Sequence, residues 1–280
     1  MEWLKLEQAL AEHDEISLMP HNRFGNSSVL ISFRSIEHLT GTKWENHTSI
    51  AVNAIHIWGI ELDGSSRCLA RCTQWLAEEE QHRAQRMFRE EDRRRYVLAH
   101  GGLRAVLSRY LGVGPDRVEL LRSEAGKPSL AKELGGRPAL TFNMSHAHDR
   151  ALIAVSKGQE IGVDIERIRS DVEVAKLSER YFTPSEHTAI IHSTQEQRAT
   201  RFFRYWVAKE AVLKARGIGI SGLSQCEIFF DTDGVGTEVA VLPESLLQNS
   251  LRVCLLPCDE GWEAAVAAQD VGRIAQGSPI

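Results

Sequence analysis

Two carboxylates share one face of a short segment near the middle of the chain. In the run Ile-Gly-Val-Asp-Ile-Glu at 161–166, apolar residues alternate with Gly162, Asp164 and Glu166. This alternation predicts a β-strand that buries its apolar side and presents both carboxylates on the opposite side. Carboxylate oxygens at this spacing suit Mg²⁺, which binds one or two carboxylates together with phosphate oxygens of a substrate. A polar strand edge facing solvent is the alternative interpretation.

A second group of charges lies on a helix predicted within Phe203–Gly217. Glu210 and Lys214 stand four residues apart with the acid first, which is the favourable order for a helix ion pair. Trp206 lies on the same face one turn earlier and indicates that this face is partly buried. Because partly buried charges are costly unless they bind something, Lys209 and Lys214 are candidates for neutralising phosphate oxygens. A simple helix ion pair is the alternative.

The third candidate is the pair Ser145 and His146, which ends a predicted strand in Phe142-Asn-Met-Ser-His146. A backbone turn and an imidazole at a strand end can both reach an anion. Adjacent strand residues point to opposite sides, which argues against a nucleophile and its base. We therefore favour a phosphate contact, with a purely structural histidine as the alternative.

The distribution of charge is uneven along the chain. Between Gln81 and Leu111 there are eight arginines and three acidic residues, a local net charge of +5, whereas the whole chain carries −5. The acidic total excludes a generally basic nucleic-acid-binding protein. The positive segment is typical of a site for a local anionic partner, and a solvated helix face is the alternative.

The elements that must position these residues follow from periodicity and turn signals. Residues 54–62 predict a strand, and 75–111 predict a helix whose Gly101-Gly102 pair indicates either close packing or a break. The order of strand, helices and strands occurs on each side of about residue 158, which predicts an α/β (α+β) fold of two similar halves. The further predicted strands are 139–144, 151–156, 161–165, 227–230, 238–242, 251–256 and 262–267, and the further helices are 172–181, 184–192 and 200–216.

The composition is that of an ordinary globular protein, with 280 residues of which 42% are hydrophobic and 25% charged. No run of eighteen apolar residues occurs, and the N-terminus lacks the regions of a secretory signal. We therefore expect a cytoplasmic protein without a membrane segment. Five cysteines, an odd number, predict free thiols rather than a disulfide framework or a zinc site.

Four short motifs occur in a fixed order along the chain. They are Gly126-Lys-Pro, Phe142-Asn-x-Ser-His146, Gly162-Val-Asp-Ile-Glu166, and Trp206-x-x-Lys-Glu-Ala-x-x-Lys214 followed by Gly217-x-Gly219. Their order and spacing resemble the signature of the Sfp-type 4′-phosphopantetheinyl transferases over about residues 54–270. Residues 1–50 lie outside the resemblance, and we expect them to form an accessory N-terminal extension.

The resemblance implies an enzyme that transfers the 4′-phosphopantetheine group of coenzyme A to a serine of an apo acyl or peptidyl carrier protein, releasing adenosine 3′,5′-bisphosphate. Such enzymes activate carrier proteins for fatty acid, polyketide or nonribosomal peptide biosynthesis. The resemblance also implies two subdomains, 51–158 and 159–272, related by pseudo-two-fold symmetry, with coenzyme A in the cleft between them and a tail at 273–280. One chain completes such a cleft, so we expect a monomer, with Mg²⁺ as its cofactor and neither nucleic acid nor membrane as a partner.

The resemblance assigns roles by position in the motifs. Asp164, Glu166 and Glu210 would hold Mg²⁺ against the pyrophosphate, and Lys214 would assist the leaving group. Glu210 is also the candidate base for the carrier serine, directly or through a metal-bound water. Glu80 lies near a position where relatives often place another base. The residues expected to contact coenzyme A are Arg83, Arg86, Arg95 (at the 3′-phosphate), Lys127, Pro128, Ser145, His146, Lys209 and Lys214.

Two other classes of protein stay open. A non-catalytic module that binds coenzyme A or a carrier would keep the pocket without turnover, but the intact carboxylates and lysines argue against it. An unrelated Mg²⁺ enzyme, such as a nucleotidyl transferase, is the other class. Neither a Gly-x-x-x-x-Gly-Lys-Ser/Thr nor a Gly-x-Gly-x-x-Gly phosphate loop is present in the sequence to support it.

Overall fold

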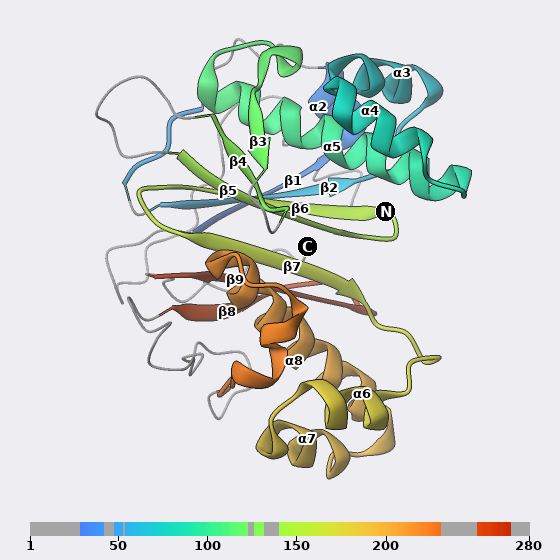
Figure 1. The fold of residues 1–280 in the computed structure, drawn as a ribbon, viewed down its shortest axis with the longest axis vertical. Coiled ribbons are helices and arrows are strands. Elements are labelled where there is room, and N and C mark those ends of the chain that lie inside the picture. The colour runs from blue at the N-terminus through green and yellow to red at the C-terminus, as the bar shows by residue number, and fades with distance from the viewer. Residues whose placement is uncertain are drawn as a thin grey trace, which may run out of the picture.

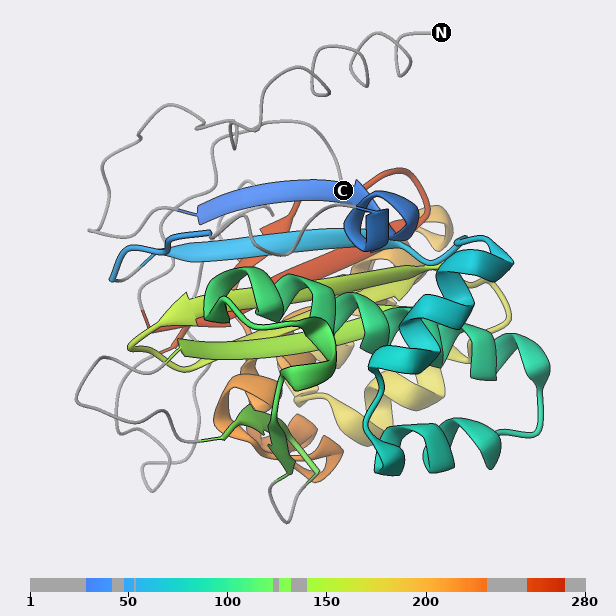
Figure 2. The ribbon, with the colours of Figure 1, turned by 90° about the horizontal axis from the view of Figure 1, so that it is seen from above.

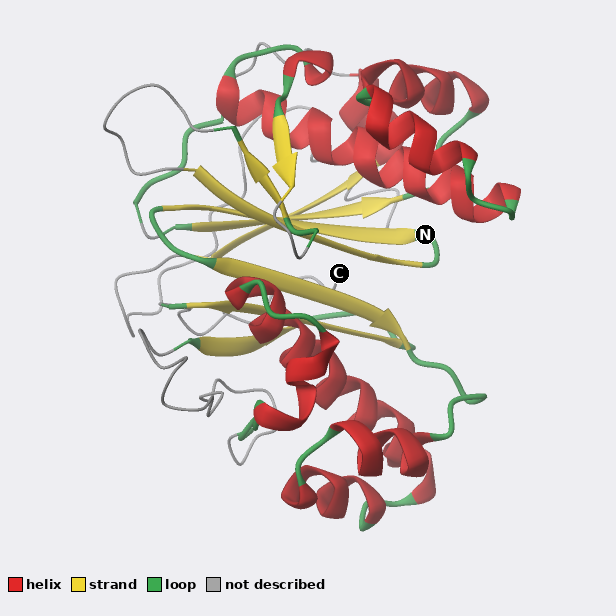
Figure 3. Cartoon of the chain, in the orientation of Figure 1, coloured by secondary structure: helices red, strands yellow, loops and turns green. Residues whose placement is uncertain are grey.

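The structure is a computed structural model of the chain, and it describes residues 29–41, 48–52, 54–122, 126–131, 140–230 and 251–269. Two sheets pack on each other in the middle of the molecule, and helices cover the outer side of each sheet (Figures 1 and 3). Among the described residues, no helix has both the length and the apolar character needed to cross a membrane.

The N-terminal sheet has four strands in the order β1-β2-β6-β5. β1 (Val29–Ser35) runs parallel to β2 (Ile55–Glu61), and β6 (Arg150–Lys157) pairs antiparallel with β2 and with β5 (Leu140–Ala147). β1, which comes from residues 1–50, therefore forms the edge strand of this sheet, and the accessory role expected for residues 1–50 stays a prediction. The three strands predicted within this sheet are confirmed to within a few residues.

Four helices form the layer outside this sheet. They are α2 (Ile36–Gly41), α3 (Ser66–Trp75), α4 (Glu78–Gln85) and α5 (Glu90–Leu111). Seen from above, α5 runs over the sheet in roughly the same direction as its strands (Figure 2). The long apolar stripe predicted for this region is thus used to cover one face of the sheet.

The single helix predicted over 75–111 is interrupted twice. Ala77 has extended backbone angles (φ −64°, ψ 157°), and the Glu80 carboxylate accepts a hydrogen bond from the Ala77 N–H at 3.0 Å. This bond allows a new helix to begin, because it satisfies one of the N–H groups that a helix start leaves unpaired. Arg89 is extended as well (φ −86°, ψ 129°), and α5 begins after it.

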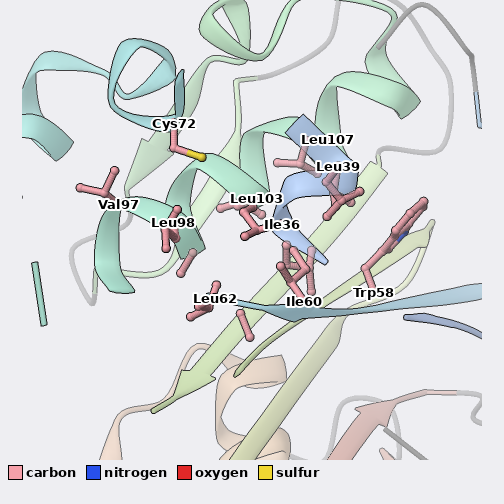
Figure 4. Close-up of a cluster of buried hydrophobic side chains, with 14 of the residues drawn as sticks. Ile36, Leu39, Trp58, Ile60, Leu62, Cys72, Val97, Leu98, Leu103 and Leu107 are labelled. Carbon is pink, nitrogen blue, oxygen red and sulfur yellow. The ribbon is translucent and has the colours of Figure 1, made fainter. Parts of the chain in front are cut away.

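The Gly101-Gly102 pair marks close packing and not a helix break, because α5 continues through both residues. A Cβ on Gly101 would lie 2.4 Å from the Cβ of Cys72 and 2.5 Å from its sulfur. Without that side chain, α3 and α5 approach each other inside a buried apolar cluster (Figure 4). The helix ends at Gly112, whose φ of 68° is left-handed.

The C-terminal sheet has three antiparallel strands in the order β7-β9-β8. The long helix α8 packs on it, and two shorter helices pack against each other and against α8. The three strands and three helices predicted for this region are confirmed to within a few residues. They are β7 (Ile161–Arg167), β8 (Arg252–Leu256), β9 (Trp262–Ala268), α6 (Val174–Tyr181), α7 (Pro184–Ile191) and α8 (Gln195–Arg216).

The structure also contains four short elements. They are η1 (Pro115–Arg117), β3 (Leu120–Arg122), β4 (Pro128–Leu130) and η2 (Ile220–Gln225). The strand predicted at 227–230 is wrong, since only Glu227 makes an isolated bridge there. The strand predicted at 238–242 lies outside the described residues.

Apolar side chains fill three spaces between these layers. One cluster lies between the N-terminal sheet and its helices, one between the two sheets, and one between α8 and the C-terminal sheet. The chain is therefore a mixed α/β protein with two regions, each built from helices and a largely antiparallel sheet. The expected pseudo-two-fold relation between the regions stays a prediction.

Candidate active site

The strand β7 separates its apolar and polar side chains as the alternation in the sequence predicts. Ile161, Val163 and Ile165 are buried in the cluster between the two sheets. Asp164 points to the other side and is only 3% exposed, and Glu166 is half-buried. Asp164 is therefore a buried charge and not part of a solvent-facing strand edge, which removes the alternative interpretation for this residue.

Gly162 brings this carboxylate face of β7 against α8. A Cβ at this position would lie 2.0 Å from the carbonyl oxygen of Ala211 and 2.5 Å from the amide nitrogen of Ala215. Because packed interiors leave no room for such contacts, any side chain here would push the helix away. The bare backbone thus lets Glu210 and Lys214, on α8, lie beside β7.

Lys214 joins three elements through one ion pair. Its ammonium donates to Asp164 Oδ1 at 2.6 Å and to Ser145 Oγ at 2.9 Å, and Ser145 Oγ donates to the same Asp164 oxygen at 2.7 Å. The side chains of Lys214 and Asp164 are 28% and 4% exposed. β5, β7 and α8 therefore meet at one partly buried carboxylate, and the N-terminal and C-terminal regions both contribute to it.

Other carboxylate oxygens at this place have no donor. Asp164 Oδ2 and Glu210 Oε1 are buried and lack a hydrogen-bond partner among the described residues. Burial raises the pKa of Glu166 to about 7, and the charges of Asp164 and Glu210 act in the same direction. Burial likewise raises the pKa of Glu210, with Asp164 adding to the effect. Crowded carboxylates with bare oxygens fit a divalent cation, which would supply the missing positive charge.

These carboxylates do not converge on one point. Within the part of the chain that the structure describes, no three His, Cys, Asp or Glu side chains form a group that could hold a metal ion. The ammonium of Lys214 lies against Asp164 instead. The Mg²⁺ role of Asp164, Glu166 and Glu210 therefore stays a prediction, which the bare buried oxygens favour.

Ser145 and His146 lie in different surroundings although they are neighbours. Ser145 is 7% exposed, and its hydroxyl is hydrogen-bonded to Asp164 and Lys214. It therefore does not pair with His146 as a nucleophile with its base. Part of the His146 residue is exposed to solvent. Desolvation of its ring by the surrounding protein, together with His100 and Lys214, lowers the pKa of His146 to about 4. The imidazole is therefore neutral near pH 7 and can donate one hydrogen bond to an anion.

The Gly-Lys-Pro turn lies at the C-terminal end of α8. Lys127 Nζ donates to the carbonyl oxygen of Ala215 at 2.9 Å, next to Lys214 in sequence. Desolvation lowers the pKa of Lys127, which the charge of Glu160 partly opposes. Pro128 begins β4 and lines a small cavity. The structure thus brings Lys127 to the end of the helix that carries Lys214, as a phosphate-binding role requires.

The three arginines expected at coenzyme A belong to α4, its C-terminal cap and α5. Arg95 is paired with Glu91 at 2.5 Å, and Arg83 lies 3.7 Å from Glu79. Arg86 caps the end of α4 and is exposed. All three lie in the N-terminal region, and their contact with the donor stays a prediction.

Lys209 lies outside the site, and its expected role at phosphate is wrong. Its side chain has no exposed surface, and its ammonium donates to the Glu186 carboxylate and to the carbonyl oxygen of Cys226. The ammonium also lies 5.0 Å from the ring centre of Phe182. Neighbouring residues on a helix point about 100° apart, so Lys209 faces the protein interior while Glu210 faces β7. Lys209 is a structural charge that ties α8 to α7.

Sequence reasoning missed a buried polar cluster on α4 and α5. Glu80 is 5% exposed and accepts from His100 Nδ1 and Arg104 Nε, both at 2.8 Å. Burial alone would raise the pKa of Glu80, but the His100 hydrogen bond and the Arg104 charge outweigh it and lower the pKa to about 2. The signal in the sequence was the spacing of His100 and Arg104, one turn apart on a predicted buried stripe.

This arrangement defines a class of protein. A mixed α/β chain places a lysine, a serine and three crowded carboxylates where its two regions meet, with a second lysine and a neutral histidine nearby. Bare carboxylate oxygens suit a divalent cation, and the lysines suit phosphate oxygens. Such a centre fits an enzyme that handles a phosphate ester or pyrophosphate.

Comparisons with known proteins identify the family. A model described as the N-terminal part of 4′-phosphopantetheinyl transferase matches residues 63–158, and one for the 4′-phosphopantetheinyl transferase superfamily matches residues 160–267. The chain is 35% identical over 237 residues to the 4′-phosphopantetheinyl transferase HetI of Nostoc sp., covering 85% of this chain and 96% of HetI. It is 27% identical over 217 residues to the 4′-phosphopantetheinyl transferase Sfp of Bacillus subtilis, covering 76% and 91%.

The chain belongs to the 4′-phosphopantetheinyl transferase superfamily and is a phosphopantetheinyl transferase. The resemblance found in its motifs is thereby confirmed. The two matched segments meet between β6 and β7, where the chain passes from one sheet to the other.

Proposed function

We propose that the protein transfers the 4′-phosphopantetheine group of coenzyme A to a serine of an apo acyl or peptidyl carrier protein. The serine oxygen forms a bond to the phosphorus that carries pantetheine, and the pyrophosphate P–O bond breaks. The serine proton passes to a base, and adenosine 3′,5′-bisphosphate leaves. The observation that carries this proposal is the meeting of Lys214, Asp164 and Ser145 beside the bare oxygens of Asp164 and Glu210.

Asp164, Glu166 and Glu210 would hold Mg²⁺. Their crowding, with two buried oxygens that lack donors, is what a divalent cation would relieve. When bound there, the ion would neutralise charge on the pyrophosphate, which otherwise repels the incoming serine oxygen. An all-carboxylate set of ligands suits Mg²⁺, Ca²⁺ and Mn²⁺ better than softer metals.

The side chains of the protein itself then handle the donor and the proton. Lys214 and Lys127 bind pyrophosphate oxygens, and Lys214 stabilises the negative charge on the leaving group. The neutral His146 donates a hydrogen bond to a phosphate oxygen. Glu210 receives the proton of the carrier serine directly or through water. No nucleophile is required on this chain, because the partner supplies the serine.

The proposed site lies where two subdomains, 51–158 and 159–272, meet. Ser145 and Lys127 come from the first, whereas Asp164 and Lys214 come from the second. A cleft between them would take coenzyme A, with Arg95 at its 3′-phosphate and Arg83 and Arg86 as further basic contacts. A single chain would complete that cleft as a monomer. Carriers of fatty acid, polyketide or nonribosomal peptide synthesis are the class of partner.

The test is mass spectrometry of several apo carrier proteins after incubation with this protein, coenzyme A and Mg²⁺. We expect one carrier serine to gain a phosphopantetheine mass, and adenosine 3′,5′-bisphosphate to appear in equal amount. Omission of Mg²⁺ and a Ser→Ala carrier are the controls. Absence of the mass gain on every acyl and peptidyl carrier tested would contradict the proposal.

A further inference from the structure

In the proposed site, the carboxylate of Asp164 would bind both the ammonium group of Lys214 and a divalent cation. Its Oδ1 already accepts from Lys214 at 2.6 Å and from Ser145 at 2.7 Å. Its Oδ2 is buried without a donor, as is Glu210 Oε1. The cation of the proposed function, on which this inference rests, would take these bare oxygens. It would then share one carboxylate with an ammonium group.

Two positive charges on one carboxylate repel each other strongly at this place. Asp164 has a side chain that is 4% exposed and Lys214 one that is 28% exposed, so little water screens the repulsion. The Lys214 ion pair with Asp164 therefore weakens the binding of a divalent cation, and a bound cation weakens that ion pair. The two cations compete as long as Lys214 has no other anion.

A phosphate donor offers that other anion. Lys214 is the more exposed partner of the ion pair, and its long side chain can turn while Asp164 stays fixed on β7. Lys127, whose ammonium donates to the carbonyl oxygen of Ala215, the residue after Lys214, is the second lysine of the proposed phosphate site. Once Lys214 turns to the donor, Asp164 loses its competing partner and is free for the metal.

We propose that Lys214 couples the binding of the divalent cation to the binding of the phosphate donor. The cation alone has to bind the bare oxygens against the charge of Lys214 on the same carboxylate, whereas coenzyme A draws the lysine away and so raises the affinity for the cation. By linkage, the cation raises the affinity for coenzyme A by the same factor. Lys214 thus acts as a positioning residue for the metal besides its contact with the donor.

The test measures Mn²⁺ binding by electron paramagnetic resonance, with and without saturating coenzyme A and without a carrier, so that no turnover occurs. In the unaltered protein we expect coenzyme A to raise Mn²⁺ affinity by ~10-fold or more. In Lys214→Met, Mn²⁺ alone should bind ~10-fold more tightly, and the further gain from coenzyme A should shrink to about 3-fold or less. Lys176→Met, which removes a lysine that is 74% exposed, should leave both affinities unchanged.

The increase in Mn²⁺ affinity that coenzyme A causes distinguishes this coupling from a simple repulsion between Lys214 and the metal ion. An equal gain in Lys214→Met and in the unaltered protein would overturn it, because the coupling would then come only from phosphate oxygens on the metal. Lys214→Arg keeps the charge and should retain the coupling, and Lys214→Gln serves if the methionine variant does not fold. Mn²⁺ binding that Asp164→Asn leaves unchanged would overturn the proposed metal site itself, which is a separate outcome.

Discussion

Gly162 on β7 lies so close to α8 that a Cβ built on it would stand 2.0 Å from the carbonyl oxygen of Ala211. This contact sets the distance between the strand that carries Asp164 and the helix that carries Lys214. The pair of elements, and not either motif alone, creates the 2.6 Å ion pair at the centre of the site. The first prediction tests this packing.

Gly162→Ala should lower the free energy of unfolding by roughly 2–3 kcal/mol, because overpacking a backbone contact forces β7 and α8 apart. The folded fraction should also lose transfer activity. Urea unfolding followed by circular dichroism measures the first effect. Gly219→Ala is the matched control, since a Cβ there meets nothing within 4 Å, and an equal loss in both variants would contradict the argument.

Asp164→Ala should lower kcat/KM for coenzyme A on the order of 10³-fold, because it removes the partner of Lys214 and a proposed metal ligand together. The protein should remain folded, as judged by its far-ultraviolet circular dichroism. Asp171→Ala, at an exposed position a few residues later, is the control. Full activity in Asp164→Ala would remove the case for a metal site.

Arg95→Ala should raise the KM for coenzyme A by about 10-fold with little change in kcat, because the proposed contact of the guanidinium with the donor lies away from the reacting phosphorus. Dephospho-coenzyme A lacks the 3′-phosphate, so with it the variant and the unaltered protein should differ less. Steady-state kinetics with coenzyme A and with dephospho-coenzyme A measures both KM values. An unchanged KM for coenzyme A would exclude the 3′-phosphate role, and the exposed Arg93→Ala is the control.

Glu80→Gln should destabilise the protein near pH 7 by about 3 kcal/mol, because it leaves the buried Arg104 without its counter-charge. The folded-state pKa of Glu80 is about 2, below its ordinary 4.5, so its ionised form stabilises the fold. That contribution is fully present above about pH 4.5 and is lost as the pH falls toward 2.

The difference in unfolding free energy between the unaltered protein and Glu80→Gln should therefore shrink as the pH is lowered from 5. Urea unfolding at several pH values measures it. Glu79→Gln, at a side chain that is 70% exposed, should change stability by less than about 0.5 kcal/mol. A difference independent of pH would contradict the assignment.

Lys209→Met should lower the stability of the fold without changing the binding of coenzyme A. Removing one partner of a buried ion pair leaves Glu186 as an uncompensated charge, which costs about 3–5 kcal/mol. The KM for coenzyme A of the folded fraction should stay unchanged. Thermal unfolding and kinetics measure the two quantities, with Lys176→Met as the surface control. A raised KM with full stability would return Lys209 to the active site.

The sequence by itself predicted most of the local elements and the family. Alternation in 161–166 predicted which side of β7 is apolar, because a strand places successive side chains on opposite faces. The order of four motifs identified the family. Glu210 and Lys214 were placed on one helix face by their spacing of four residues.

Only the tertiary structure decided which of these residues meet. Ser145 and Asp164 are brought together by the packing of β5 beside β7, which no local period encodes. Lys209 and Lys214 look alike in the sequence, but one is enclosed against Glu186 and the other reaches Asp164, because the helix turns them to different neighbours. Long-range contacts and close backbone approaches make that choice, and both depend on how the layers stack.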